Sequence, residues 1–353
     1  MKQLKLHYLF VALVLSLALA SCHTDNPAPN ATVSVTTGLY VLNQGLFNSN
    51  NASLSLYDLG TKQVITDRFN LVNGRGLGDT GNDMETYGSK TYIVMNVSST
   101  VEVINTKTSK SIAQIKFING ASPRQPRNIV FYKNNAYITS YDGTVAVMDT
   151  AALTVSKYIA VGNDPEQMAI SNGKLYVANS GGLNYPNYDK TVSVIDLTTQ
   201  AVVKTLTVVV NPQNVAADAY GNVYVLSAGD YGTTPSSLAI IDASTDVVKS
   251  QTNFDGSGMT LQGDNLFFIT SAKAIKVFNT KSQTVTSANF ITDGTVITTP
   301  YCVAVDSYTG EVFVGDAKGY GSVGAVVAFD RNGVKEYTFA TGPLPCKIAF
   351  IKN

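Results

Sequence analysis

The 353-residue sequence contains no tryptophan, three cysteines and two histidines, and these shortages exclude several kinds of chemistry. Both histidines, His7 and His23, lie at the N-terminal end. The rest of the chain therefore has no imidazole for a Ser-His-Asp triad or a His-ligated metal site. The sequence also lacks a phosphate-binding loop, a nucleophile elbow and a zinc motif. We therefore predict a protein that is not an enzyme and that has no metal and no cofactor.

Charge of either sign is also scarce, since Asp, Glu, Lys and Arg make up 14% of the chain. The 25 basic residues balance the 25 acidic ones, and removal of residues 1–21 would remove two lysines, which leaves a small negative excess. Nucleic-acid binding needs a strongly basic surface, which this balance does not provide. We expect no nucleic-acid partner.

Only one long apolar run is present, LFVALVLSLALA at residues 9–20, and it follows Lys2 and Lys5. It is short for a membrane span and occupies the position of a secretory signal. The next residues, up to Cys22, look like a bacterial lipobox. We predict a signal peptide at residues 1–21 and a lipid anchor on Cys22; the alternative is an ordinary signal peptide with an incidental cysteine. Residues 22–36 are polar and proline-rich and read as a flexible tether.

A repeated unit occupies residues 37–353, and its clearest copy is PEQMAISNGKLYVANSGGLNYPNYDKTVSVIDLTTQAVV at residues 165–203. Alternating Val, Ile and Tyr, interrupted by Asn-Gly and Gly-Gly, predict four short strands with tight turns and no amphipathic helix. One such sheet cannot bury both of its apolar faces. It must pack against copies of itself.

Two recurring residues mark seven copies of this unit along the chain. An aromatic residue recurs in the second strand, at Tyr40, Tyr92, Tyr137, Tyr176, Tyr224, Phe267 and Phe313. An acid or amide ends the third strand, at Asp58, Asn105, Asp149, Asp196, Asp242, Asn279 and Asp330. A period of roughly 40 to 50 residues made of strands predicts an all-β, seven-bladed β-propeller. The first copy lacks an inner strand and the chain ends with a spare one, residues 345–350, so we expect the C-terminal strand to complete blade 1 and close the ring.

Long connections gather on one face of the predicted ring. The spacing between the two markers is longest in blades 1, 4, 5 and 7, and the additional residues fall between the second and third strands. These loops, at residues 43–53, 179–191, 227–237 and 315–324, are rich in Tyr, Asn and Gly. Rigid aromatic surface combined with amides suits a large, partly polar ligand. The alternative is that these loops are solvated connections whose tyrosines cap the blades.

Residues that follow the first proline of each inner strand are expected to line the channel mouth on the same face. They are Arg127 and Asn128, Glu166 and Gln167, Gln213 and Asn214, Tyr301 and Cys302, with Lys347 from the closing strand and Asn82 and Asp83 at the matching place in blade 2. The alternative is a ring that only hydrates the channel. Cys302 and Cys346 are one residue out of register between neighbouring blades, which makes a disulfide between them doubtful.

The repeat is similar to the YncE-type, or YVTN-type, propellers. Longer strings extend the likeness from Gly38 to Ile351: GLYVLNQG, NNASLSLYD, NGRGLGDTGNDMETYGSKTYIVMNVSSTVEVI, RQPR, YDGTVAVMDT, NSGGLNYPNYDKTVSVID, NFITDGT and TPY. Together they resemble the surface cobalamin-binding lipoproteins of the BtuG type. The resemblance implies a propeller anchored on the outer membrane and facing outward. Such a protein binds cobalamin or another corrinoid on one face and passes it to a TonB-dependent outer-membrane transporter.

The resemblance and the loop pattern lead to one set of expectations. We expect a monomer outside the transporter complex, with cobalamin as a transported ligand. The residues predicted to contact it are Arg75, Asp83, Arg124, Arg127, Tyr141, Glu166, Tyr185, Tyr188, Asp189, Gln213, Tyr231, Tyr301 and Tyr320. Two other classes stay open. A protein-interaction scaffold would use the same face, and a propeller lyase or glycan hydrolase would rely on an acid such as Glu166 or Asp83.

Overall fold

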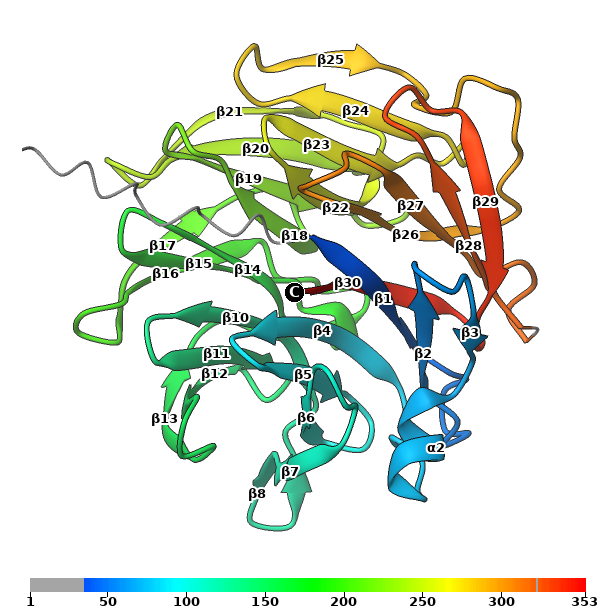
Figure 1. Ribbon diagram of the computed structural model, residues 1–353. Helices are drawn as coiled ribbons and strands as arrows, with labels where there is room; N and C mark the ends of the chain where they lie inside the picture. The colour runs from blue at the N-terminus through cyan, green and yellow to red at the C-terminus, as the bar shows by residue number, and fades with distance from the viewer. Residues whose placement is uncertain (1–34, 322) are drawn as a thin grey trace, which may run out of the picture. The chain divides into compact units, whose positions relative to one another are not determined.

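The computed structural model describes residues 35–321 and 323–353. The predicted signal peptide, Cys22 and nearly all of the predicted tether lie outside the described residues. Within them the strands form seven four-stranded antiparallel sheets and one two-stranded sheet, which confirms the predicted seven-bladed propeller (Figure 1). No helix among the described residues is long and apolar enough to span a membrane.

Each blade runs from an inner strand beside the central channel to an outer strand at the rim. In this order the strands of the first three blades are β30 (Pro345–Lys352), β1 (Thr36–Asn43), β2 (Ser53–Asp58) and β3 (Val64–Ile65); β4 (Gly81–Tyr87), β5 (Lys90–Met95), β6 (Thr100–Asn105) and β7 (Ser111–Lys116); β10 (Pro126–Tyr132), β11 (Asn135–Ser140), β12 (Thr144–Asp149) and β13 (Val155–Ala160). Blades 4 and 5 comprise β14 (Pro165–Ser171), β15 (Lys174–Asn179), β16 (Thr191–Asp196) and β17 (Ala201–Thr207); β18 (Pro212–Ala217), β19 (Asn222–Ser227), β20 (Ser237–Asp242) and β21 (Val247–Asn253). Blades 6 and 7 comprise β22 (Ser257–Gln262), β23 (Asn265–Ile269), β24 (Ile275–Asn279) and β25 (Thr284–Ser287); β26 (Pro300–Val305), β27 (Val312–Asp316), β28 (Ala325–Phe329) and β29 (Lys335–Ala340).

The ring closes through the last strand of the chain. In blade 1, β30 pairs antiparallel with β1, with Val41 opposite Ile348 and Leu39 opposite Phe350. Figure 1 shows the red β30 beside the blue β1 at the centre of the ring. This pairing confirms the predicted closure and covers an inner edge that β1 would otherwise expose. Residues 36–352 thus supply every strand of the seven sheets.

The hydrophobic core is divided among the seven junctions between neighbouring blades. Seven clusters of buried residues are present, and each combines side chains from two adjacent blades. Tyr176 of blade 4, for example, packs with Val223 and Ile241 of blade 5. Since both faces of a blade are buried in this way, no blade has a complete core without its neighbours.

The two sequence markers have distinct structural roles. The second-strand aromatics are buried, and the Tyr40 hydroxyl donates a hydrogen bond to the carbonyl oxygen of Thr106 in the next blade, at 2.8 Å. The acids and amides at the ends of the third strands instead accept bonds from backbone amides of the following turn. Asp149, for example, accepts from Ala151 and Ala152 at 2.8 and 2.6 Å. The aromatic therefore joins blades, whereas the acid closes a turn within one blade.

Two connections between blades depart from the predicted all-strand repeat, and the loop between β15 and β16 within blade 4 contains the 3-10 helix η1 (Gly182–Asn184). The link from blade 1 to blade 2 contains the short helix α2 (Arg68–Asn73), which buries Phe69. The Asp67 side chain caps its first turn, and Gly74 in the left-handed conformation ends it. The link from blade 2 to blade 3 contains the hairpin of β8 (Ile118–Asn119) and β9 (Ser122–Pro123). A helix of six residues leaves too short an apolar pattern to detect in the sequence.

Candidate functional site

One face of the propeller carries the starts of the inner strands and the loops between second and third strands; we call it the mouth face. The long loops of blades 1, 4, 5 and 7 span residues 44–52, 180–190, 228–236 and 317–324, as predicted. The corresponding loops of blades 2, 3 and 6 are short. The mouth face is therefore raised on two sides, at blades 4 and 5 and at blades 7 and 1.

A cavity of about 450 Å³ lies at the channel mouth on this face. Blades 1 to 5 supply its walls. Its lining residues are Asn82, Asp83, Arg127, Asn128, Tyr141, Glu166, Gln167, Gly182, Leu183, Tyr188, Asn211, Gln213, Asn214, Tyr231, Cys346 and Lys347. Seven of the thirteen predicted contact residues are in this set: Asp83, Arg127, Tyr141, Glu166, Tyr188, Gln213 and Tyr231.

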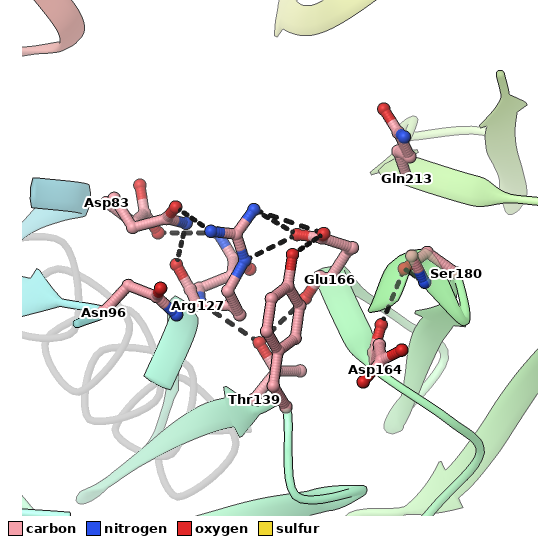
Figure 2. Close-up of polar contacts among 12 residues, drawn as sticks. Asp83, Asn96, Arg127, Thr139, Asp164, Glu166, Ser180 and Gln213 are labelled. Carbon is pink, nitrogen blue, oxygen red and sulfur yellow. Dashed lines mark hydrogen bonds and ion pairs between the residues drawn. The ribbon is translucent and has the colours of Figure 1, made fainter. Parts of the chain in front are cut away.

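An ion pair between blades 3 and 4 forms one wall of this mouth cavity (Figure 2). Arg127 donates two hydrogen bonds to the Glu166 carboxylate, from Nε at 2.9 Å and from Nη2 at 3.2 Å. The Tyr141 hydroxyl donates to the same carboxylate at 2.6 Å, and the Arg127 guanidinium lies 4.6 Å from the centre of the Tyr141 ring. A third blade joins through Asn82, whose side-chain oxygen accepts from Arg127 Nη1.

A second network links the inner strands of blades 1, 2 and 3, which are β30, β4 and β10. Lys347 Nζ lies 2.9 Å from Asp83 Oδ1 and 2.8 Å from Glu85 Oε1. The other Asp83 oxygen accepts from Asn128 Nδ2 at 2.6 Å and from the backbone amide of Ile129 at 3.0 Å. Asp83 is almost completely buried. Its charge is therefore compensated by one cation and two hydrogen-bond donors.

The pKa shifts agree with charges that are fixed in pairs. Burial alone would lower the pKa values of Arg127 and Lys347, but the neighbouring carboxylates outweigh burial and raise both. Burial, and then the Glu166 charge, raise the pKa of the Tyr141 hydroxyl, so it stays a hydrogen-bond donor. The mouth cavity thus contains two cations and two carboxylates that cancel each other. Such a surface offers hydrogen bonds to an uncharged polar ligand more readily than it attracts an ion.

Three tyrosines form a rim beside the mouth cavity on blades 4 and 5. Tyr185 and Tyr188 meet edge to face with ring centres 6.0 Å apart, and Tyr188 meets Tyr231 in the same way at 6.1 Å. Tyr185 and Tyr231 are 74% and 72% exposed. The Tyr231 hydroxyl accepts from Gln213 Nε2 at 3.3 Å, which connects the rim to the cavity wall. We call these three residues the tyrosine rim.

Two carboxylates hold the loop that carries Tyr185 and Tyr188. Asp164 Oδ2 accepts from the backbone amide of Leu183 at 2.9 Å. Asp189, a predicted contact, accepts from the backbone of Asn163 at 3.0 Å and from the Thr191 hydroxyl at 2.7 Å. Asp189 does not line the mouth cavity and is already engaged in fixing the loop. The structure therefore shows Asp189 fixing the loop that carries Tyr185 and Tyr188, and its contact with a ligand stays a prediction.

The remaining predicted contacts lie elsewhere. Arg75 ion-pairs at 2.9 Å with Glu102, whose side chain is fully buried in blade 2. Arg124 ion-pairs with Asp142 and stacks at 3.7 Å on the Tyr158 ring. Neither arginine lines the mouth cavity. The structure thus gives both arginines intramolecular partners, and their contact with a ligand stays a prediction.

Tyr301 and Tyr320 lie on the side of the mouth opposite the tyrosine rim. Their ring centres are 6.4 Å apart, and the Tyr301 hydroxyl donates to Gln44 Oε1 at 2.6 Å. Tyr320 is 67% exposed, whereas Tyr301 lines the central channel. Sequence reasoning did not find Leu183 and Asn211 at the mouth cavity. Cys346 could have been found, because it follows Pro345 as Arg127 follows Pro126.

The central channel holds a larger cavity of about 780 Å³, whose lining includes Cys302 and Cys346. Both cysteines are free, in agreement with their doubtful register. Burial raises the pKa of Cys302 to about 12 and that of Cys346 well above its ordinary value. Both thiols therefore stay protonated and weakly nucleophilic near neutral pH. Within residues 35–321 and 323–353, no three Asp, Glu, Cys or His side chains gather closely enough to hold a metal ion.

Residues 37–351 match the family described as "Domain of unknown function (DUF5074)", and the chain belongs to this family. No curated protein matches. The fold is similar to a quinonprotein alcohol dehydrogenase-like protein from Bacteroides thetaiotaomicron, at 17% identity and a TM-score of 0.66, over 90% of this chain and 79% of that one.

Two further solved structures are similar in fold. Hydrazine synthase of Kuenenia stuttgartiensis matches at 17% identity and a TM-score of 0.58, over 69% of this chain and 74% of that chain. The computationally designed Ika8 protein matches at 13% identity and a TM-score of 0.56, over 87% and 88%. Identities this low extend to the propeller fold alone.

Proposed function

We propose that this member of the DUF5074 family is a surface lipoprotein that captures cobalamin or a related corrinoid on its mouth face without chemical turnover. In this proposal the protein passes the ligand to a TonB-dependent transporter in the outer membrane. The ligand identity and the transporter rest on the resemblance to BtuG-type lipoproteins. The structure contributes the fold and a cavity on the face that the loop pattern predicts.

One observation supports the proposal most directly: the tyrosine rim stands beside a polar, charge-balanced cavity. A corrinoid has a flat, largely apolar macrocycle with amide side chains at its edge. Tyrosine rings suit the macrocycle because they offer apolar area with little conformational entropy to lose. Paired Arg127 and Glu166, with Gln213, offer donors and acceptors to the amides. The two parts of the site thus match the two parts of the ligand.

The location proposed for the protein rests on residues outside the described part of the chain. Lys2, Lys5 and the apolar run at residues 9–20 lead to Cys22, where we expect a lipid. The tether would end where β1 begins, at Thr36. Globomycin, which blocks lipoprotein signal cleavage, should cause a larger, unprocessed precursor to accumulate in cells. Processing that is unaffected by globomycin and by Cys22→Ala would contradict the lipid anchor.

Equilibrium dialysis of residues 23–353 against cyanocobalamin tests the capture. Because the protein has no tryptophan whose fluorescence could report binding, the ligand is measured by its own visible absorbance. We expect saturable binding of one ligand per chain. Combined Tyr188→Ala and Tyr231→Ala should weaken it by more than about tenfold, since each ring loses its stacking area. Tyr308→Ala is the matched control, because Tyr308 is 52% exposed on the opposite face. No retention by a folded wild-type sample would refute the proposal.

A protein-interaction scaffold is the second candidate, and exposed apolar side chains favour it. Phe47, Val296, Tyr320 and Val323 are 70%, 85%, 67% and 63% exposed on the mouth-face loops of blades 1, 6 and 7. Isolated apolar residues on a surface need no explanation, but four on neighbouring loops suit a protein partner. Phe47→Ser with Val296→Ser should abolish capture of the transporter from detergent extracts and leave corrinoid binding unchanged. Loss of both would place these residues in the ligand site instead.

A further inference from the structure

A ring of side chains separates the mouth cavity from the central channel, and one blade breaks it. The ring position recurs once per blade. It lies two residues after the proline or glycine that begins the inner-strand motif, and two residues before the alanine where the motif reads Pro-x-x-Val-Ala. Antiparallel pairing to the second-strand aromatic fixes this register. From blade 1 to blade 7 the ring residues are Lys347, Asp83, Asn128, Gln167, Asn214, Gly258 and Cys302. Blade 6 alone among the seven has no side chain there.

Gly258 borders open space. Its φ is +57°, and a Cβ built on it would meet only Ile269 Cδ1 within 4 Å, at 3.8 Å. The residue before it, Ser257, is also small, where other blades place Arg127, Glu166 or Tyr301. Gly258 lines the 780 Å³ channel cavity. The ring is therefore open at blade 6, between Asn214 and Cys302.

The mouth cavity and the channel cavity adjoin at the ring. Gln167, Asn214, Cys346 and Lys347 line both. Below the ring, blades 6 and 7 supply apolar side chains to the channel wall, next to the polar Thr260, Gln262 and Ser307. The apolar lining there includes Met259, Phe267, Ile269, Val303 and Val305. The lining continues to Ser89 and Lys107 in turns on the opposite face.

Two ring amides are available to a ligand. Among the described residues, no protein group forms a hydrogen bond with the side-chain amides of Gln167 and Asn214. The ring amide of Asn128, in contrast, is engaged with Asp83 and with the backbone of Met168. The one charged ring residue that lines the channel, Lys347, is already held by two carboxylates. The side-chain amides of Gln167 and Asn214 can therefore donate and accept hydrogen bonds, while no unpaired charge lies beside them on the ring. This combination suits an uncharged amide group of a ligand.

We propose that the ring is the gate of a second subsite: an uncharged, amide-bearing side arm of the ligand passes over Gly258 and hydrogen-bonds to Gln167 and Asn214. This inference rests on the proposed function and deepens it. The macrocycle stays on the tyrosine rim, and one arm reaches into the channel. Two levels of contact hold the ligand, and the glycine of blade 6 sets which side groups can enter.

The two thiols beside the opening provide a direct test. In residues 23–353 the cysteines are Cys302 and Cys346, and both line the channel cavity. Methylmercury labelling, followed by mass spectrometry of the intact protein, reports access to each thiol in single Cys→Ser variants. Saturating cyanocobalamin should slow labelling of Cys302 by about tenfold or more, because reactivity follows access. Cys302 lines the channel cavity but not the mouth cavity. Because the channel also reaches the opposite face, a ligand that only covers the mouth would leave Cys302 reachable.

Substitution of the ring glycine gives the second measurement. Asparagine tolerates the left-handed conformation, so Gly258→Asn fills the opening with little backbone strain. We expect this variant to bind cyanocobalamin about tenfold more weakly, because the side arm can no longer reach Gln167 and Asn214. A tenfold change corresponds to the net contribution of one to two hydrogen bonds. Gly263→Asn is the matched control: its φ is +56°, nothing lies within 4 Å of its Cβ position, and it lies in the β22–β23 turn.

The outcomes separate the two proposals. If wild-type protein binds cyanocobalamin but Cys302 stays reactive and Gly258→Asn binds normally, the channel subsite is refuted and corrinoid capture stands. If wild-type protein retains no cyanocobalamin, the proposed function fails and the subsite fails with it. Thiol protection together with weakened binding by Gly258→Asn, but not by Gly263→Asn, supports both.

Discussion

Replacement of Lys347 by methionine tests how the closing strand is attached to the ring. Lys347 lies on β30, and its ammonium contacts Asp83 and Glu85 on β4 of the next blade at 2.9 and 2.8 Å. The Asp83 side chain is 5% exposed and that of Lys347 is 31% exposed. Methionine keeps the length and apolar volume of the lysine stem but removes the charge. The variant therefore leaves a buried carboxylate without its cation.

The expected loss in the free energy of unfolding depends on the hydrogen bonds that Asp83 retains in the variant. Removal of one partner of a fully buried ion pair typically costs about 3–5 kcal/mol. Asp83 retains hydrogen bonds from Asn128 and from the Ile129 amide, and Lys347 is partly solvated. We therefore expect the free energy of unfolding to fall by about 2–3 kcal/mol. Urea unfolding followed by far-ultraviolet circular dichroism measures it.

Two variants make this result interpretable. Lys352→Met removes a lysine from the same strand whose ammonium contacts the Ser307 hydroxyl, and it should change stability by less than about 0.5 kcal/mol. Asp83→Asn added to Lys347→Met removes both charges and should recover about half of the loss. If the free energy of unfolding of Lys347→Met lies within about 0.5 kcal/mol of the wild-type value, the ion pair does not stabilise ring closure and the reasoning is wrong.

Three further predictions concern other parts of the molecule. Arg75→Ala should lower the free energy of unfolding by about 1–3 kcal/mol, because it leaves the buried Glu102 carboxylate with only neutral partners; urea unfolding measures this loss, and dialysis of the same sample against cyanocobalamin tests the predicted ligand contact of Arg75. Tyr40→Phe should cost about 1–2 kcal/mol through the lost bond to Thr106 in the next blade, with no change in the circular dichroism of the folded state. Acid should destabilise the propeller: hydrogen bonds from the backbone of Thr234 and its neighbours lower the pKa of Asp230 from 3.8 to about 2, and backbone bonds likewise lower the pKa values of the turn aspartates. Since the folded values lie below the unfolded ones, this stabilisation is complete above pH 3.8 and is lost as the pH falls toward 2, so a thermal midpoint that stays constant across that range would contradict it.

Local sequence signals were sufficient for the architecture. The second-strand aromatics and the third-strand acids recur because each blade needs the same inter-blade contact and the same closed turn, as Tyr40 and Asp149 show. Loop lengths between the two markers revealed which loops are long and that they share a face. The residues after the inner-strand prolines of blades 3, 4 and 5 were placed at the mouth correctly, because strand alternation is local and repeats in every blade. Tyr301 and Cys302, which follow the corresponding proline of blade 7, instead line the channel cavity.

Local sequence signals did not predict which side chains pair with one another across the fold. Both Arg75 and Arg124 were predicted at the ligand site from the loop pattern and from the family resemblance of the strings that contain them. The structure engages Arg75 with Glu102 and Arg124 with Asp142 and Tyr158. A sequence shows that an arginine is available but not which acid it meets, since side-chain direction depends on how neighbouring blades pack. The helix α2 was missed for a similar reason: its single buried residue, Phe69, has meaning only against the core of blades 1 and 2.

The sequence by itself determined the number of blades, the closing strand and the face on which long loops gather, because each depends on spacing along one chain. The tertiary structure decided the site. Arg127 meets Glu166 across a blade junction, Lys347 meets Asp83 across the ring closure, and Gly258 becomes an opening only beside Asn214 and Cys302. These relations join residues far apart in sequence. They exist only after seven similar sheets have packed around one axis and brought corresponding positions to the same level.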